Sequence, residues 1–266
     1  MRWWRLRRLA WLGLGCAGCV PPVRAPAAPG VQRVVFVGDS LVNRSEREFS
    51  LLTRVREVVE RAHPGIALEL VNAGVNGDVI GGIRARLQRD VLALAPAAVV
   101  LYWDSDAVDG ESPGDPPSRT AERRVAYERD LDEVLRRLTA ATPTVVVSGP
   151  TLVGERRHGR NPKDHVLDLY AAINRRWCLA RHATWVDTRR AAFLWLGHEA
   201  GAYRSESGRL TVDGEHLNAW GVALVAQELG TALARGLRHQ HRHDDAVPPP
   251  HAVAKNTPTD PPIDRK

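Results

Sequence analysis

The sequence predicts an α/β fold in which a parallel sheet is covered by helices on both faces. Five short apolar segments alternate with longer segments of helical periodicity, an order that is typical of consecutive βα units. The 266-residue chain is 44% hydrophobic and 26% charged, so it can form one globular domain with a sizeable core. The sequence shows no internal repeat.

Each element follows from its own local pattern. Strands are expected over residues 33–37, 66–71, 98–103, 144–148 and 184–187. Helices are expected over residues 46–63, 79–94, 120–141 and 164–181, and a last helix begins near its N-cap Asn218. The helix at 120–141 has an apolar face that includes Val125, Leu131 and Leu138. Ligands of such sheets bind at the carboxyl ends of the strands, which makes the polar residues there the candidate site.

The first 18 residues are expected to be a signal peptide of the lipoprotein type. They hold four arginines and then an apolar run that is too short to span a bilayer as a mature helix. Small residues precede Cys19, as in a bacterial lipobox, which makes Cys19 the expected lipidation site and Cys16 the alternative. We therefore expect an exported lipoprotein that a lipid anchors in the cell envelope. A plain signal peptide or a weak membrane anchor is the alternative.

Composition divides the remainder into three parts. Residues 19–31 are rich in Pro and Ala and are expected to be a spacer, residues 32–237 form the domain, and residues 238–266 have the composition of a disordered tail. The net charge of +6 includes four arginines in residues 1–18, which contain no acid, so the rest of the chain carries +2. Without a basic stripe, nucleic acid is not an expected partner. Cys178 lies in an apolar helical pattern and is expected to be buried and inert.

Three short motifs carry the chemistry. Gly-Asp-Ser-Leu at 38–41 follows the first strand, and a glycine-rich turn at 72–78 follows the second and can present backbone N–H groups to an anion. That turn does not match a phosphate-binding P-loop. Asp213 and His216 stand three residues apart just before the last helix, where the carboxylate can orient the imidazole toward a nucleophile.

Together the three motifs resemble the SGNH hydrolases, also called the GDSL esterase/lipase family. The residues that carry the resemblance are Gly38-Asp39-Ser40-Leu41, Asn72-x-Gly74-x-x-Gly77-Asp78 and Asp213-x-x-His216. The resemblance covers about residues 31–236 and implies a flavodoxin-like three-layer α/β/α sandwich with a five-stranded parallel sheet. It also implies Ser40 as the nucleophile, His216 as the general base and then acid, and Asp213 as the group that orients His216.

The implied oxyanion hole departs from the family pattern at one of its three donors. The backbone N–H groups of Ser40 and Gly77 match, but the Asn that the family places after the third strand is missing. Asp106 stands in its place, with Ser105 as the alternative alignment. An ionised Asp106 cannot donate a hydrogen bond to the oxyanion. Three alternatives remain for stabilising the oxyanion: a protonated Asp106 donates, the Ser105 hydroxyl donates, or the two backbone donors are sufficient alone. Loss of one such donor typically costs about 10²–10³ in turnover.

The resulting interpretation is a serine esterase with an acyl-serine intermediate and no metal or organic cofactor. The expected substrate is a short-acyl ester, such as acetyl on an envelope or extracellular carbohydrate. A lipid or lysophospholipid ester is the first alternative, and a weak or dead SGNH domain that serves as a carbohydrate-binding module is the second. A metal site at Asp39, Asp104, Asp106 and Asp109 leaves Ser40 and His216 unexplained.

Two charged loops are expected to border the site. Residues 109–118 are acidic, and residues 154–163 are basic, with Arg156, Arg157 and Arg160. The basic loop either attracts an anionic substrate, such as an acidic polysaccharide or a lipid headgroup, or is simply solvated.

Overall fold

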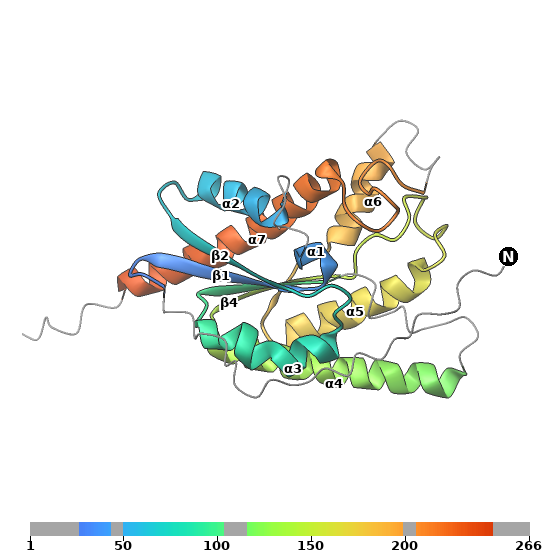
Figure 1. Ribbon diagram of the computed structural model, residues 1–266, viewed down its shortest axis with the longest axis horizontal. Coiled ribbons are helices and arrows are strands. Elements are labelled where there is room, and N and C mark those ends of the chain that lie inside the picture. Colours follow the sequence, from blue (N-terminus) through green and yellow to red (C-terminus); the bar gives the residue numbers. More distant parts are fainter. Residues whose placement is uncertain (1–26, 44–49, 104–115, 199–205, 247–266) are drawn as a thin grey trace, which may run out of the picture.

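The computed structural model describes residues 27–43, 50–103, 116–198 and 206–246. Five parallel strands form one sheet in the order β2-β1-β3-β4-β5 (Figure 1). The strands are β1 (Val31–Gly38), β2 (Ala67–Gly74), β3 (Ala98–Tyr102), β4 (Thr144–Ser148) and β5 (Thr184–Trp185). The α/β class and the five-stranded parallel sheet are therefore confirmed.

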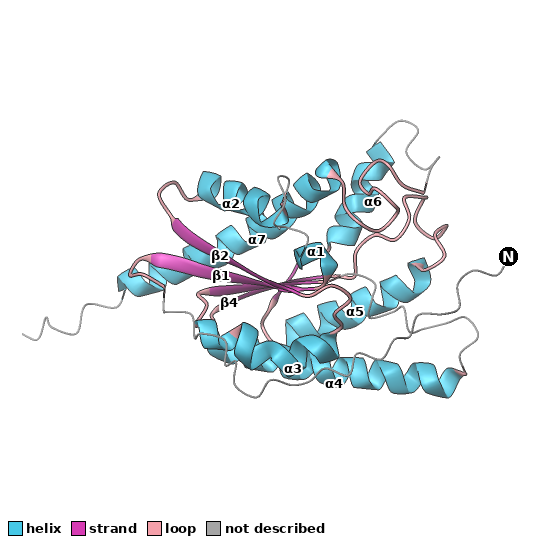
Figure 2. Cartoon of the chain, viewed as in Figure 1, coloured by secondary structure: helices cyan, strands magenta, loops and turns pink. Residues whose placement is uncertain are grey.

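Helices cover both faces of this sheet, which makes three layers (Figures 1 and 2). The long helices are α2 (Leu51–Ala62), α3 (Ile80–Asp90), α4 (Pro117–Ala141), α5 (Asp164–Ala180), α6 (Thr188–His198) and α7 (Ala219–Ala246). Two short elements are the helix α1 (Ser40–Asn43) and the 3₁₀ turn η2 (Leu92–Leu94). Helices α2 and α7 lie on one face, and α3, α4 and α5 lie on the other.

The core is divided by the alternation of side chains along the strands. In β1, Val35 and Val37 pack with α3, α4 and α5, whereas Val34 and Phe36 pack with α1, α2 and α7. All four side chains are fully buried. A strand that is buried on both faces is apolar at every position, which is why these segments are uninterrupted apolar runs in the sequence.

The structure corrects three local expectations. Strand β5 is only two residues long and ends at Trp185, because Asp187, the expected end of the strand, instead caps α6. Helix α6 itself is absent from the sequence prediction. Val125 is 70% exposed, although Leu131 and Leu138 on the same helix are fully buried, because at 3.6 residues per turn Val125 lies roughly 120° away from Leu131 around the axis of α4.

The ends of the chain bear on the expected domain organisation. Helix α7 continues to Ala246, beyond residue 238, where composition places the start of the tail. Residues 1–26, which include Cys16 and Cys19, lie outside the described residues, as do 247–266. None of the helices in the described residues is both long enough and apolar enough to cross a membrane.

Candidate active site

The first site residue, Ser40, begins helix α1 directly after β1. Gly38 has to be glycine, because a Cβ there would lie 1.7 Å from the carbonyl oxygen of Tyr102 on the neighbouring strand. This close approach brings the chain past β3 before it turns at Asp39. The buried Asp39 carboxylate accepts a hydrogen bond of 2.9 Å from the Leu41 N–H, which fixes the turn that presents Ser40.

The glycine-rich loop after β2 packs against this turn. The Asn72 side-chain amide donates to the Val42 carbonyl (3.1 Å), and its oxygen accepts from the Gly74 N–H (2.9 Å). Gly77 has φ of +68°, a conformation that favours glycine. Among the described residues, neither the Ser40 N–H nor the Gly77 N–H has a hydrogen-bond acceptor. Both groups are therefore available as donors to a bound oxyanion.

Asp213 and His216 form the pair that their spacing predicts. The Asp213 Oδ2 atom lies 2.7 Å from His216 Nδ1, and Asp213 Oδ1 accepts the backbone N–H groups of Glu215 and His216 at 3.1 and 2.8 Å. Asp213 thus fixes both the turn and the ring. The imidazole is 24% exposed and the carboxylate 52% exposed, so the pair lies at an open edge of the site.

The same contacts set the protonation of the pair. Partial burial raises the pKa of Asp213, but hydrogen bonds from the His216 ring and from the two backbone N–H groups outweigh it and lower the pKa to about 2. An ionised Asp213 accepts only, so the hydrogen on the neutral imidazole is assigned to Nδ1. The lone pair of Nε2 is then free to take a proton.

Ser40 and His216 are not hydrogen-bonded to each other in this structure. Neither the Ser40 hydroxyl nor His216 Nε2 has a hydrogen-bond partner within the described part of the chain. Hydrogen bonds between nucleophile and base are often long without substrate and tighten in the Michaelis complex. The structure therefore supplies an oriented base and an accessible hydroxyl, without a preformed contact between them.

Arg86, which the sequence analysis overlooked, joins the two loops that carry Ser40 and Gly77. Its guanidinium lies 2.7 Å from Asp78 Oδ2 and donates to the carbonyls of Ala73 (2.7 Å) and Gly38 (3.2 Å). These carbonyls close the carboxyl ends of β2 and β1. Arg86 is 10% exposed, so this cation is held by the backbone of the site and by Asp78.

Glu155, also overlooked, holds the segment that leads to Asp213. The residue is 1% exposed, and its carboxylate accepts the backbone N–H groups of Arg209 (2.8 Å), Leu210 (2.8 Å) and Thr211 (2.7 Å). The Thr211 hydroxyl adds a fourth contact of 2.7 Å. One lone acid within the basic run 154–163 was the signal that could have revealed it.

The third oxyanion donor cannot be placed. Asp106, Ser105, Asp104 and Asp109 lie outside the described residues, so the role of Asp106 stays a prediction. The same holds for the metal alternative, of which only Asp39 is described. Among the described residues, no group of three or more His, Cys, Asp or Glu side chains is arranged to hold a metal ion.

The basic loop does border the site, because the Gly154 N–H donates to the Gly214 carbonyl (2.7 Å).

Residues 36–224 match the sequence profile of the GDSL-like lipase/acylhydrolase family, and this range contains both the Ser40 turn and the Asp213–His216 pair. The chain belongs to this family. By family it is a serine ester hydrolase, as the SGNH resemblance implies. A comparison with curated proteins found no match.

Solved structures of two acetyl xylan esterases share the fold. The acetyl xylan esterase AlAXEase superposes with a TM-score of 0.66 at 24% identity, over 76% of this chain and 99% of its own. Axe2, an acetylxylan esterase from Geobacillus stearothermophilus, superposes with a TM-score of 0.61 at 18% identity, over 77% and 94%. Catalytic mutants of Axe2 replace a serine, an aspartate and a histidine.

Proposed function

We propose that this protein removes a short acyl group, acetyl in the first instance, from a carbohydrate through an acyl-Ser40 intermediate. The observation that carries the proposal is the 2.7 Å contact between Asp213 and His216 Nδ1, which leaves Nε2 as a base. As Ser40 Oγ attacks the ester carbonyl carbon, Nε2 takes the hydroxyl proton. The carbonyl oxygen becomes an oxyanion, which the N–H groups of Ser40 and Gly77 stabilise.

The remaining steps use the same groups in reverse. The tetrahedral intermediate collapses, the bond to the alcohol oxygen breaks, and His216 gives its proton to that oxygen. A water molecule then attacks the acyl-Ser40 carbonyl while His216 again takes a proton, and the carboxylic acid and free Ser40 are released. Asp213 remains ionised throughout and stabilises the imidazolium that forms in each half of the reaction.

The choice of an acetylated carbohydrate is supported by the family and by two similar structures. AlAXEase and Axe2 are both acetyl xylan esterases, and each superposes over about three quarters of this chain, at 76% and 77%.

We further propose that the protein is exported and lipid-anchored, which the arginine-rich start and Cys19 support. Metabolic labelling with a radioactive fatty acid should label the chain, and Cys19→Ser should abolish the label while Cys16→Ser retains it. Label that persists in Cys19→Ser contradicts this site.

Hydrolysis of p-nitrophenyl acetate tests the reaction. The wild type should turn over and Ser40→Ala should not, whereas Ser50→Ala, which loses only the N-cap of α2, should retain activity. Asp106→Asn tests the missing amide: a rate increase shows that Asp106 does not donate, and a decrease shows that it does. An inactive wild type with an active Asp106→Asn contradicts the esterase proposal and favours a carbohydrate-binding role. Equal turnover by wild type and Ser40→Ala contradicts the mechanism.

A further inference from the structure

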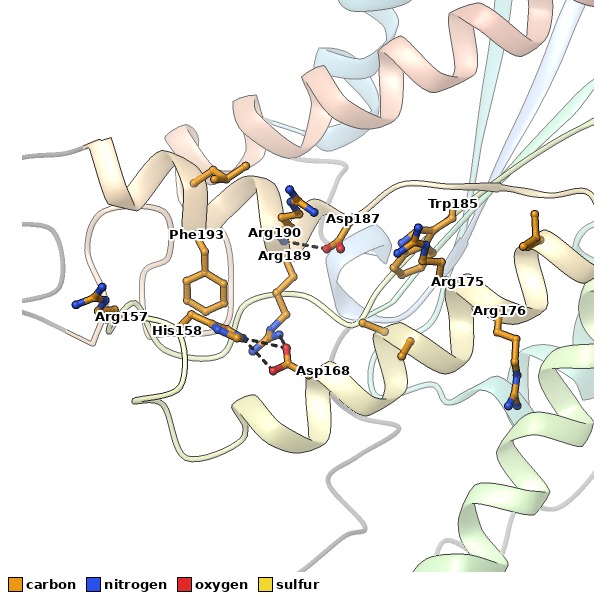
Figure 3. Close-up of a pocket in the computed structure, with 14 residues that line it drawn as sticks. Arg157, His158, Asp168, Arg175, Arg176, Trp185, Asp187, Arg189, Arg190 and Phe193 are labelled. Atoms are coloured by element: carbon orange, nitrogen blue, oxygen red, sulfur yellow. Dashed lines mark hydrogen bonds and ion pairs between the residues drawn. The ribbon is translucent and has the colours of Figure 1, made fainter.

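A cavity of about 940 Å³ lies between α5 and α6, beside the edge strand β5 (Figure 3). We call it the α5–α6 groove. Ala171 and Ala172 on α5 leave the space open because their side chains are small, and Trp185 of β5 lines the wall. None of the proposed catalytic residues, Ser40, Asp213 or His216, lines this groove.

Arginine dominates the charge of the groove. Five arginines line it, namely Arg157, Arg175, Arg176, Arg189 and Arg190, against two aspartates, Asp168 and Asp187. The arginines and aspartates of the lining therefore sum to a formal charge of +3. This concentration of positive charge exceeds that of the chain as a whole, which carries +6 over 266 residues.

Both aspartates of the groove are already engaged. Asp168 pairs with Arg189 and lies 2.9 Å from His158 Nε2 (Figure 3). Asp187 caps α6, since its Oδ1 accepts the Arg190 backbone N–H at 2.9 Å. Among the described residues, neither carboxylate forms an ion pair with Arg157, Arg175 or Arg190.

Three of the arginines have no such partner. Arg189 is neutralised by Asp164 (2.5 Å) and Asp168, and Arg176 pairs with Glu128 outside the groove. Within the residues that the structure describes, no side chain or backbone group hydrogen-bonds or ion-pairs with the guanidinium of Arg157, Arg175 or Arg190. These groups are exposed and come from the 154–163 loop, α5 and α6, so they surround the groove from three sides.

The groove also offers apolar and aromatic surface. Trp185 and Phe193 line it, and Leu179 and Leu194 at its rim are 80% and 56% exposed. Aromatic faces beside hydrogen-bonding groups suit sugar rings, and guanidinium groups bind carboxylates with two parallel hydrogen bonds. This combination fits a chain of sugars that carries carboxylates better than it fits a bare ion.

The groove is directly linked to the segment that carries the catalytic pair. Arg157 lies two positions after Glu155, whose carboxylate holds the backbone at 209–211, and Gly154 bonds to Gly214. The 154–163 loop therefore contacts the Asp213–His216 turn through Gly154 and lines the groove through Arg157 and His158. A polymer bound in the groove would be tethered next to the esterase site.

We propose that the α5–α6 groove binds the uronic-acid carboxylates of an acidic polysaccharide and so selects acetylated chains that are anionic. The inference rests on the proposed carbohydrate-ester function, because it names the polymer on which that reaction takes place. Arg157, Arg175 and Arg190 bind the carboxylates, and Trp185 contacts a sugar ring.

Calorimetric titration of the purified full chain tests the groove. Turnover is removed with Ser40→Ala, and the probes are a xylan with glucuronic-acid side groups and the same xylan after its carboxyls are reduced to alcohols. The acidic xylan should bind at least about tenfold more tightly, and the difference should shrink at high salt. Equal affinity for both xylans overturns the proposal, as does tighter binding to phosphatidylglycerol vesicles or to single-stranded DNA.

Charge-matched variants locate the effect. Arg175→Glu/Arg190→Glu should weaken binding of the acidic xylan about tenfold or more. Arg129→Glu/Arg136→Glu, which makes the same charge change on the exposed surface of α4, should leave binding within about twofold. An equal loss in both double variants overturns the site. These measurements are independent of turnover, so failure of p-nitrophenyl acetate hydrolysis refutes the esterase proposal alone.

Discussion

Removal of the Glu155 carboxylate should destabilise the loop that carries the proposed catalytic pair. Glu155→Ala deprives the N–H groups of Leu210 and Thr211 of their acceptor, and these two residues are 1% and 0% exposed. A buried donor that loses its partner costs about 1–3 kcal/mol, so the two together cost roughly 2–6 kcal/mol. Because water can enter the space left by the side chain, we expect a loss of about 3 kcal/mol.

The conservative variant separates the hydrogen bonds from the charge. Glu155→Gln keeps the oxygen that Leu210 and Thr211 need and loses only the acceptor of the Arg209 N–H. We expect Glu155→Gln to lower the free energy of unfolding by about 1–2 kcal/mol. For a domain of this size, 3 kcal/mol lowers the melting temperature by roughly 6–12 °C.

Thermal and urea unfolding measure these losses, and p-nitrophenyl acetate hydrolysis measures their consequence. In Glu155→Ala, kcat should fall more than KM rises, because the loop misplaces His216 rather than the bound ester. Glu133→Ala, on the exposed surface of α4, is the control and should change stability by less than about 0.5 kcal/mol. A loss below about 1 kcal/mol in Glu155→Ala, with unchanged kcat, would refute the reasoning.

Three further predictions use other parts of the structure. Arg86→Met should lower the free energy of unfolding by about 3 kcal/mol and kcat by up to about 10²-fold. Arg84→Met on the same helix should change neither quantity. Equal effects of the two variants would contradict the positioning role of Arg86. The pKa of Asp213, lowered to about 2, gives stability that is present above the unfolded value of about 3.9 and is lost as pH falls toward 2. The difference in melting temperature between wild type and Asp213→Asn should therefore shrink as pH falls below about 3.9 and vanish only below about pH 2, and a constant difference would contradict it. Burial raises the pKa of Cys178 to about 12, so mass spectrometry of its peptide should find no alkylation of the folded protein, and rapid alkylation would contradict this.

The sheet could be predicted because its strands are buried on both faces. Residues 144–148 have a continuous apolar pattern apart from their two ends, and the observed strand has the same bounds. The Asp213–His216 contact was predictable too, since it is local and depends on a spacing of three residues. Both predictions rest on patterns of residues that are close together in the sequence.

Long-range contacts explain what the sequence did not reveal. Glu155 binds backbone groups 54 to 56 positions away, and Arg86 reaches a carbonyl 48 positions away, so neither partner has a side-chain signature. Helix α6 was missed because Asp187, taken as the end of a strand, instead caps the helix that follows. Without α6, the α5–α6 groove could not be foreseen either.

Trapping the acyl-enzyme tests the central claim most directly. The full chain is mixed with p-nitrophenyl acetate, quenched with acid within the first turnovers and digested, and its peptides are examined by mass spectrometry. The account predicts an acetyl group on the peptide that contains Ser40, and slower appearance of this group in His216→Ala, because His216 is also the base of the acylation step. Continued turnover with no acetyl group on Ser40, or the same adduct in Ser40→Ala, would contradict it.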